Sequence, residues 1–251
     1  MHPFSMKRLV LLRHGQSEWN AAGRFTGWVD VMLTPQGREE AVQAGRLLRA
    51  AGIHVRQAFT SVLTRAIETL NLALLEMGLS WIPVQKDWRL NERHYGLLQG
   101  MGKQAAAEEY GAEQVRLWRR SYEAVPPVLP PDLARHQHGD ARYHHVPPWR
   151  LPTAESLADT LVRVRSCWLE TLAPVLLRRG DLFVVAHGNS LRALLMLLRG
   201  LTPQEVEPLN VPTGIPLLVE TDDSLQFRGQ RYLADAIRVE SALAAAERGQ
   251  G

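Results

Sequence analysis

Hydrophobic runs alternate with amphipathic stretches along this chain. The run "RLVLLRH", residues 8–14, is apolar through its centre and predicts a strand buried on both faces. A helical pattern follows over residues 34–52, with Thr34 as N-cap, Pro35 in the first turn and Gly52 at the end. "QAFTS" then predicts a second strand and "LTRAIETLNLALLEMG" a second helix. This alternation indicates an α/β fold, a mostly parallel sheet flanked by helices on both faces.

The opening pattern returns late in the chain. "DLFVVAHGN" predicts a strand that stops at His187 and Gly188, followed by a helix from about Asn189. The first strand likewise stops at Arg13 and His14. A single histidine after a strand is usually a loop residue. Because ligands bind beyond the carboxyl ends of parallel strands, however, two such histidines at one edge predict a shared site.

Residues 124–152 have a different composition from the rest of the chain. The segment "AVPPVLPPDLARHQHGDARYHHVPPWRLP" is rich in proline and histidine and has no periodic apolar pattern, which predicts an irregular insertion in a single domain spanning residues 1–251. A metal site is an alternative, but no cysteine or carboxylate stands at a recognised ligand spacing, so we expect a solvated loop and no metal. The histidines concerned are His136, His138, His144 and His145.

Composition restricts the classes of partner. Hydrophobic residues make up 45% and charged residues 22%, as in a globular protein with a full core. A net charge of +3 from 29 cations and 26 anions is too small for a polybasic nucleic-acid arm. "LRALLMLLRGL" is too short to span a membrane, and the opening "MHPFS" lacks the features of a signal peptide. A single cysteine, Cys167, excludes an intramolecular disulfide and fits a reducing cytoplasm.

Arginine and histidine together at a strand end suit one kind of ligand. A guanidinium group pairs with two oxygens of a phosphate, and an imidazole nitrogen can attack phosphorus. The loop after His14 adds Gly15, Ser17 and Asn20, whose amides and polar side chains could face the same phosphate. The residues therefore predict phosphoryl transfer.

Several motifs, in order, resemble those of the cofactor-dependent (2,3-bisphosphoglycerate-dependent) phosphoglycerate mutases of the histidine phosphatase superfamily. They are "RHGQSEWN", "FTGWVDVMLTPQG", "TSVLTRAIETL", "LNERHYGLLQG", "WRR", "ESLADT" and "AHGNSLRAL". The resemblance runs from about Lys7 to about Ile237. "RHG" alone marks only the superfamily, whereas "NERHYG" with "WRR" and the long insertion is typical of the mutase branch.

The resemblance implies that 3-phosphoglycerate and 2-phosphoglycerate are interconverted through a phosphohistidine, with 2,3-bisphosphoglycerate as primer and without a metal. It implies His14 as the nucleophile, with Arg13, Arg65 and His187 completing the phosphate pocket. To attack, His14 must be neutral at one nitrogen, so its other nitrogen should donate to an acceptor such as a backbone carbonyl. Glu92 is implied as general acid and base. Without the resemblance, Arg65 would be a helix surface charge and Glu92 a salt-bridge partner.

The remaining family positions would hold the phosphate and carboxylate of the substrate. They correspond to Asn20, Thr26, Gly27, Arg93, Tyr95, Lys103, Arg119, Arg120, Gly188 and Asn189. Two departures from the family pattern stand out: Gly102 precedes Lys103 where an asparagine is common, and the tail, residues 238–251, lacks a lysine-rich ending. Relatives of this kind are often dimers or tetramers, so a homodimer or homotetramer is expected.

Two other functions remain open. A histidine-type phosphatase of small phosphorylated metabolites would pass the phosphoryl group to water, but such enzymes usually lack the "NERHYG" and "WRR" segments. A catalytically silent phospholigand-binding protein belongs to a different class. Intact residues at all five proposed catalytic positions argue against it: Arg13, His14, Arg65, Glu92 and His187.

Overall fold

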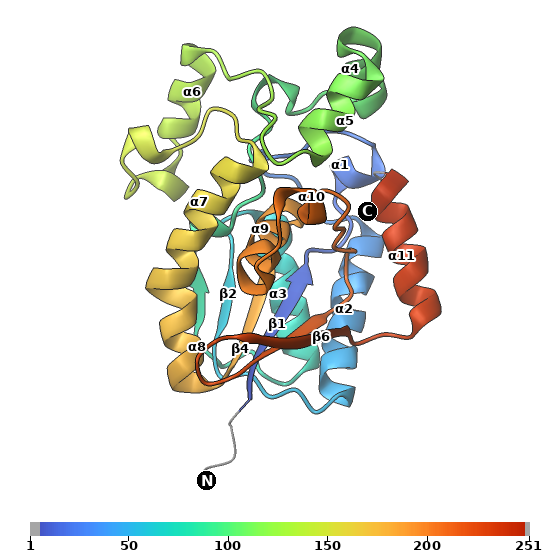
Figure 1. The fold of residues 1–251 in the computed structure, drawn as a ribbon, viewed down its shortest axis with the longest axis vertical. Helices are drawn as coiled ribbons and strands as arrows, with labels where there is room; N and C mark the ends of the chain where they lie inside the picture. The colour runs from blue at the N-terminus through green and yellow to red at the C-terminus, as the bar shows by residue number, and fades with distance from the viewer. Residues whose placement is uncertain (1–5, 249–251) are drawn as a thin grey trace.

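The computed structural model describes residues 6–248 (Figure 1). The opening "MHPFS", which lacks the sequence features of a signal peptide, and the last three residues of the tail lie outside the described residues.

A six-stranded sheet has the order β3-β2-β4-β1-β5-β6. The strands β3, β2, β4 and β1 pair in parallel, so the predicted mostly parallel sheet is confirmed. β5 and β6 add an antiparallel edge that the sequence pattern did not predict. The strands are β1 (Lys7–Arg13), β2 (Ala58–Thr60), β3 (Val84–Lys86), β4 (Asp181–Ala186), β5 (Leu217–Thr221) and β6 (Phe227–Tyr232).

Helices cover both faces of the sheet (Figure 1). Alternate residues of β1 divide between two cores: Leu9 and Leu11 face one, Val10 and Leu12 the other, and all four are fully buried. This double burial explains the uninterrupted apolar run that opens the sequence. The helices are α1 (Glu18–Ala21), α2 (Pro35–Ala50), α3 (Thr64–Glu76), α4 (Lys103–Tyr110), α5 (Ala112–Arg120), α6 (Pro131–His138), α7 (Leu157–Cys167), α8 (Ala173–Arg179), α9 (Gly188–Arg199), α10 (Pro203–Val206) and α11 (Ala236–Arg248).

The loop after β1 is held against the start of α2. Thr34 caps this helix as predicted, because its hydroxyl accepts the amide of Gly37 at 3.0 Å. A Cβ on Gly15 would lie 2.1 Å from the carbonyl oxygen of Gly37, so only glycine permits this contact. Ser17 caps α1 with its hydroxyl. Gly15 and Ser17 therefore shape the loop instead of facing a phosphate, contrary to the sequence-based expectation.

Residues 124–152 are more ordered than the composition suggests. They contain α6 and two short 3-10 helices, Ala141–Tyr143 and Pro148–Arg150. Proline is tolerated in the first turn of a helix, which is where Pro131 stands, so a proline-rich segment can still begin one. Its apolar residues also bury in a small cluster against Trp28, and these are Tyr143, Val146 and Leu151.

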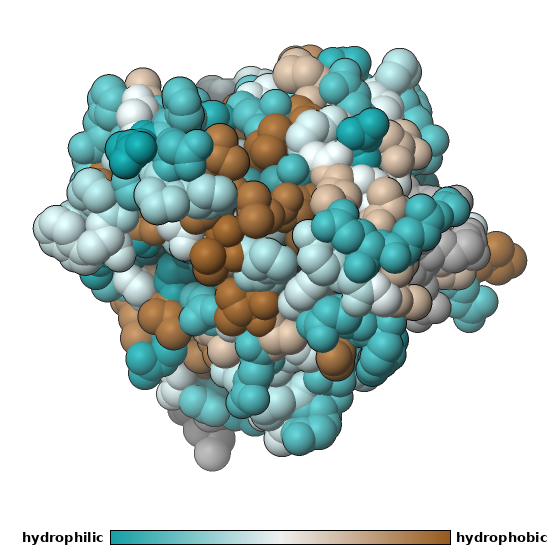
Figure 2. All heavy atoms as spheres, turned by 90° about the horizontal axis from the view of Figure 1, so that it is seen from above, coloured by the Kyte–Doolittle hydropathy of each residue, from teal (hydrophilic) through white to brown (hydrophobic). Residues whose placement is uncertain are grey.

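The end of the molecule that carries α4, α5 and α6 is shown in Figure 2, where hydrophobic side chains gather near the middle of a largely hydrophilic face. Within residues 6–248, no helix has both the length and the hydrophobicity needed to cross a membrane. The same residues contain no group of three or more His, Cys, Asp or Glu side chains placed to hold a metal ion.

Candidate active site

His14 stands immediately beyond the end of β1. Its amide donates to the carbonyl of Ala186, the last residue of β4, at 3.0 Å, which joins the two strand ends. Its Nδ1 lies 2.7 Å from the carbonyl oxygen of Gly15. A carbonyl only accepts hydrogen bonds, so Nδ1 carries the proton and Nε2 keeps its lone pair. Burial, followed by Arg65 and Arg13, lowers the pKa of His14 well below its ordinary value, and the ring is neutral.

Arg65, on α3, is a site residue and not a surface charge. Only 1% of the residue is exposed, and its Nε lies 3.3 Å from His14 Nε2. Its two terminal nitrogens donate to the carbonyls of Val29 at 3.0 Å and Gly27 at 2.8 Å. Burial lowers the pKa of Arg65 to about 10, which still leaves it charged at neutral pH. A fixed cation therefore lies beside the nucleophilic nitrogen.

The second histidine lies next to the first, as predicted. The ring centroids of His187 and His14 are 4.9 Å apart. His187 Nε2 lies 2.7 Å from the hydroxyl of Ser61, a buried residue after β2 that the sequence did not single out. Burial, followed by Arg65 and His14, lowers the pKa of His187 well below its ordinary value. Arg13 closes this side of the site, donating to the carbonyl of Val211 at 3.0 Å.

Glu92 reaches the site from the segment that joins two 3-10 helices, Trp88–Leu90 and Gly96–Leu98. Its Oε1 accepts the amides of Arg93 at 2.7 Å and Asn189 at 3.0 Å. A Cβ on Gly188 would lie 3.6 Å from Glu92 Oε2, so this glycine keeps the space beside that oxygen open. Glu92 is thus held by backbone amides and is not an ion-pair partner.

These groups line one cleft, together with most of the predicted substrate-binding residues. The predicted residues that line it are Arg13, His14, Asn20, Thr26, Gly27, Arg65, Glu92, Tyr95, Lys103, Arg119, Arg120, Gly188 and Asn189. Arg24, Phe25, Arg192, Asn210, Val211 and Ala246 line it as well, and the sequence did not single them out. Among the described lining residues, the cleft therefore combines one carboxylate with seven cationic side chains.

Two predicted residues do not line the cleft. His187 is fully buried against His14, behind the cleft surface. Arg93 is also fully buried, and its NH2 donates to the hydroxyl of Tyr95 at 3.1 Å and the carbonyl of Arg119 at 2.8 Å. Arg93 therefore holds cleft residues in place from behind, and its role as a direct substrate ligand stays a prediction.

Tyr95 is available as a donor. Its hydroxyl oxygen accepts a hydrogen bond from Arg93 and a second one, at 3.2 Å, from the side-chain amide nitrogen Nδ2 of Asn189. Both partners are donors, so the phenolic hydrogen is left for an anionic ligand. Although burial acts in the opposite direction, the arginines around Tyr95 lower the pKa of its phenol.

The comparisons with known proteins agree with this site. The profile of the histidine phosphatase superfamily (branch 1) matches residues 9–137. Over 97% of its length the chain is 53% identical to a 2,3-bisphosphoglycerate-dependent phosphoglycerate mutase of Nitratidesulfovibrio vulgaris, covering 98% of that protein. The chain belongs to this mutase family. A mutase of the same name from Hydrogenobaculum is 50% identical over 95% of the chain and 96% of its own length.

Solved structures support the fold of the mutase family. The structure of mycobacterial hydrolase 1 superposes with a TM-score of 0.70 over 92% of this chain and 100% of its own, at 24% sequence identity. At that identity, the likeness concerns the fold alone.

One departure from the mutase pattern leaves the cleft intact. Gly102 has a φ of −64°, an ordinary value that any residue adopts, and it pairs with Arg24 as an isolated bridge. The amide of Lys103 donates to the carbonyl of Gly23 at 2.8 Å, so the first turn of α4 is anchored. Backbone hydrogen bonds therefore hold the chain on both sides of Gly102. The other departure is the tail, whose residues 238–248 belong to α11, and Ala246 of this helix lines the cleft.

Arg192 lines the cleft of the mutase, although the sequence did not single it out, and it hydrogen-bonds to several neighbouring segments. Its NH1 donates to Asn189 Oδ1 at 2.8 Å, and its NH2 donates to the carbonyls of Arg120 at 3.0 Å and Val206 at 2.8 Å. Burial lowers its pKa to about 9. The sequence could have indicated this residue, because Arg192 stands three residues after Asn189 and therefore on the same face of α9.

Proposed function

We propose that this protein interconverts 3-phosphoglycerate and 2-phosphoglycerate through a phosphohistidine at His14, primed by 2,3-bisphosphoglycerate. The observation that carries the proposal is the state of His14. Its proton is held at Nδ1 by a carbonyl, and Nε2 points to Arg65 in a cationic cleft. Membership of the mutase family supports the choice of substrate.

The cleft suits a bisphosphorylated three-carbon acid. Arg13 and Arg65 lie beside His14, where a phosphoryl group would be received. Lys103, from α4, and Arg119 and Arg120, from α5, supply further cations for a second phosphate and a carboxylate. When bound, the primer supplies the first phosphoryl group. These cations are numerous enough to pair with two phosphates and a carboxylate, which supports a ligand with several negative charges.

The proposed chemistry assigns one task to each group. His14 Nε2 forms the N–P bond as the ester O–P bond of the donor breaks, and the departing oxygen takes a proton from the Glu92 carboxyl. In the second transfer the Glu92 carboxylate accepts the proton of the attacking substrate hydroxyl, and the N–P bond breaks. Arg13 and Arg65 neutralise the charge on the transferred oxygens.

The fixed position of Glu92 supports this proton transfer. Two amides engage Oε1, which leaves Oε2 as the oxygen that carries the proton. A carboxylate held in this way changes little between its two roles, so the same oxygen serves both half-reactions.

A coupled assay of 3-phosphoglycerate conversion with and without 2,3-bisphosphoglycerate tests the proposal. We expect activity that depends on the primer, and an intact mass that gains one acid-labile phosphoryl group in the wild type but not in His14→Ala. Full activity of His14→Ala, or release of inorganic phosphate as the main product, would reject the mutase mechanism.

We also propose that no metal takes part, because the arginines supply the positive charge that Mg²⁺ supplies in many phosphoryl-transfer sites. Activity should survive EDTA. Reversible loss of activity that Mn²⁺ restores would point to another mutase chemistry.

We place the activity in the cytoplasm, in keeping with a single buried cysteine. We also expect a homodimer or homotetramer, which light scattering on the purified protein would reveal.

A further inference from the structure

The segment that carries Glu92 has no regular secondary structure to hold it. Residues 91–94 lie between two 3-10 helices and are all nearly or fully buried. Buried carbonyls and amides need partners, and here no helix or strand ladder supplies them. The position of Glu92 therefore depends on side chains from elsewhere in the chain.

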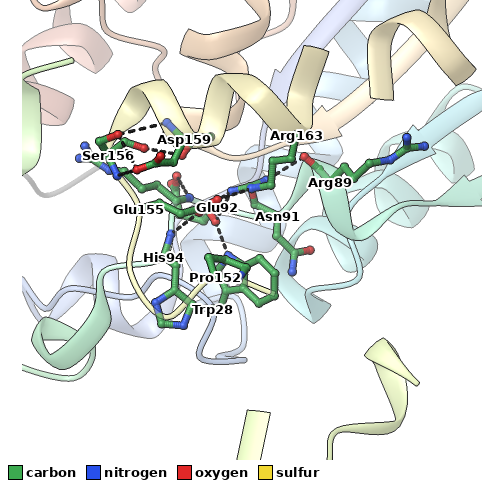
Figure 3. A network of polar contacts seen from close by, with 12 residues as sticks. Trp28, Arg89, Asn91, Glu92, His94, Pro152, Glu155, Ser156, Asp159 and Arg163 are labelled. Atoms are coloured by element: carbon green, nitrogen blue, oxygen red, sulfur yellow. Dashed lines mark hydrogen bonds and ion pairs between the residues drawn. The ribbon is translucent and has the colours of Figure 1, made fainter. Parts of the chain in front are cut away.

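Arg163, on α7, supplies two of those partners and also holds a carbonyl just before the segment (Figure 3). Its NH1 donates to the carbonyls of Arg89 at 2.7 Å and Asn91 at 2.9 Å. Its NH2 donates to the carbonyl of Glu92 itself at 2.9 Å. One guanidinium group thus binds three carbonyls at and just before the proposed proton carrier.

The other hydrogens of Arg163 go to Glu155. Arg163 Nε donates to Glu155 Oε1 at 2.7 Å, and NH2 donates to Oε2 at 2.9 Å. All five N–H groups of Arg163 are then engaged. The two side chains are only 7% and 3% exposed, so the ion pair is buried as well as fully hydrogen-bonded.

Glu155 also holds the far side of the Glu92 segment. Its Oε2 accepts the amide of His94 at 2.8 Å, and its own amide donates to the carbonyl of His94 at 2.9 Å. Trp28 adds a hydrogen bond from its indole nitrogen to the carbonyl of Glu92 at 2.6 Å. The segment is therefore fixed on both sides of Glu92.

We propose that Arg163 and Glu155 form a clamp that positions Glu92 for proton transfer during the mutase reaction. This inference rests on the proposed role of Glu92. Neither clamp residue lines the cleft, so both are positioning residues that act through the backbone of the Glu92 segment. Proton transfer depends steeply on geometry, and a displacement of about 1 Å can cost about 10²-fold in rate. Glu155 is the first residue of the "ESLADT" motif, to which the proposed phosphoryl transfer assigns no role. The clamp supplies a role for this residue.

Arg163→Lys is the informative variant, because lysine keeps the charge but offers three donors that cannot reach five acceptors. We expect kcat to fall roughly 10- to 100-fold while KM for 3-phosphoglycerate changes much less. Glu155→Gln should have the same effect, since its amide group turns N–H donors toward those of Arg163 and His94. Having two variants keeps the test valid if one of them fails to fold.

Arg8→Lys is the matched control. Arg8 lies near the start of β1, at the opposite end of the strand from His14, and its guanidinium group binds the Asp181 carboxylate through two nitrogens. We expect this variant to lose stability in thermal unfolding but to keep its kcat. If Arg163→Lys and Arg8→Lys lower kcat equally, the effect is general loosening and the clamp is rejected.

A double-mutant cycle with Glu92→Gln separates the clamp from the function on which it rests. If the clamp acts through Glu92, Arg163→Lys should lower kcat little further in the Glu92→Gln background. Additive losses, or a folded Arg163→Lys enzyme with wild-type kcat, would overturn the clamp. A Glu92→Gln enzyme that keeps wild-type kcat would instead overturn the proposed role of Glu92.

Discussion

Lys103 changes its charge within the physiological pH range. Burial, followed by Arg119, Arg13 and Arg120, lowers the pKa of its ammonium group to about 7. The arginines around it stay charged at this pH, so Lys103 is the cation of the cleft that pH can remove. The affinity of the free enzyme for an anionic substrate should follow this titration.

KM for 3-phosphoglycerate should therefore rise as pH increases above 7, by up to about tenfold per pH unit if the charged lysine is required. The direction follows from the lowered pKa, since the ammonium group is present below pH 7 and lost above it. Lys103→Arg keeps its charge and should flatten the profile between pH 7 and 8, below the pKa of about 9 of Arg192. Parallel profiles for the two enzymes would exclude Lys103 from binding.

Glu92→Gln keeps the shape of the Glu92 side chain but removes its ability to transfer a proton. The amide can still accept the hydrogen bonds of Arg93 and Asn189, but it cannot take up the substrate's proton. General acid and base catalysis contributes about 10²- to 10⁴-fold, so kcat should fall by roughly that factor. Steady-state kinetics on a variant with unchanged thermal unfolding checks this. A kcat within a few-fold of wild type would remove Glu92 from the chemistry.

At the level of elements, one side chain of α9 ties this helix to α5 and α10. Arg192 binds Asn189 on its own helix, the carbonyl of Arg120 at the end of α5, and the carbonyl of Val206 at the end of α10. Of these segments, α9 and the end of α5 carry residues that line the cleft. The relative position of the substrate-binding groups on α5 and α9 thus depends in part on Arg192.

Arg192→Met should raise KM for 3-phosphoglycerate by more than it lowers kcat. Each hydrogen bond from a charged group contributes about 1.5–3 kcal/mol, and Arg192 makes several of them to substrate-binding segments rather than to the reacting groups. Arg199→Met, at the exposed end of the same helix, is the control. The role assigned to Arg192 would be wrong if both variants kept the wild-type KM.

The sequence predicted the elements that follow a strong local pattern. The strand ends at His14 and His187 were correct because each has a continuous apolar run before it, and Thr34 capped its helix as its type and position suggest. The edge formed by β5 and β6 was not predicted. Strand direction is a property of pairing between distant segments, and local pattern does not contain it.

The supporting arginines of the site could not be predicted in the same way. Arg163 and Arg192 stand in amphipathic helical sequence, where an arginine is ordinarily solvated. Their acceptors are backbone carbonyls that lie far from them in the sequence, including those of Glu92 and Arg120. Motif similarity likewise did not show that Arg93 lies behind the residues that line the cleft.

For the molecule as a whole, buried histidines make stability depend on pH. Burial lowers the pKa of His94 to about 4, and it lowers those of His14 and His187 well below their ordinary value. The unfolded chain binds these protons near pH 6.5, whereas the folded protein does not. The free energy of unfolding should therefore fall as pH decreases from 6.5 toward 4.

Each such histidine contributes up to about 1.4 kcal/mol per pH unit in this window. His94→Gln should reduce the pH slope of the unfolding free energy by about one proton, whatever its effect at pH 7. Urea unfolding between pH 7 and 5 measures this slope, and His54→Gln, at an exposed position, serves as control. Equal slopes for His94→Gln and wild type would contradict the assignment.

The central place of β1 has a consequence for biosynthesis. Its partners in the sheet are β4 and β5, and the 167 residues between β1 and β4 must be made before the first of these pairings can form. At about 5–20 residues per second, a ribosome takes roughly ten to thirty seconds to make them. The apolar run of β1 is thus among the first segments to emerge, long before its neighbours in the sheet are made. During that interval the nascent chain depends on chaperones or on transient collapse to keep Leu9–Leu12 from aggregating.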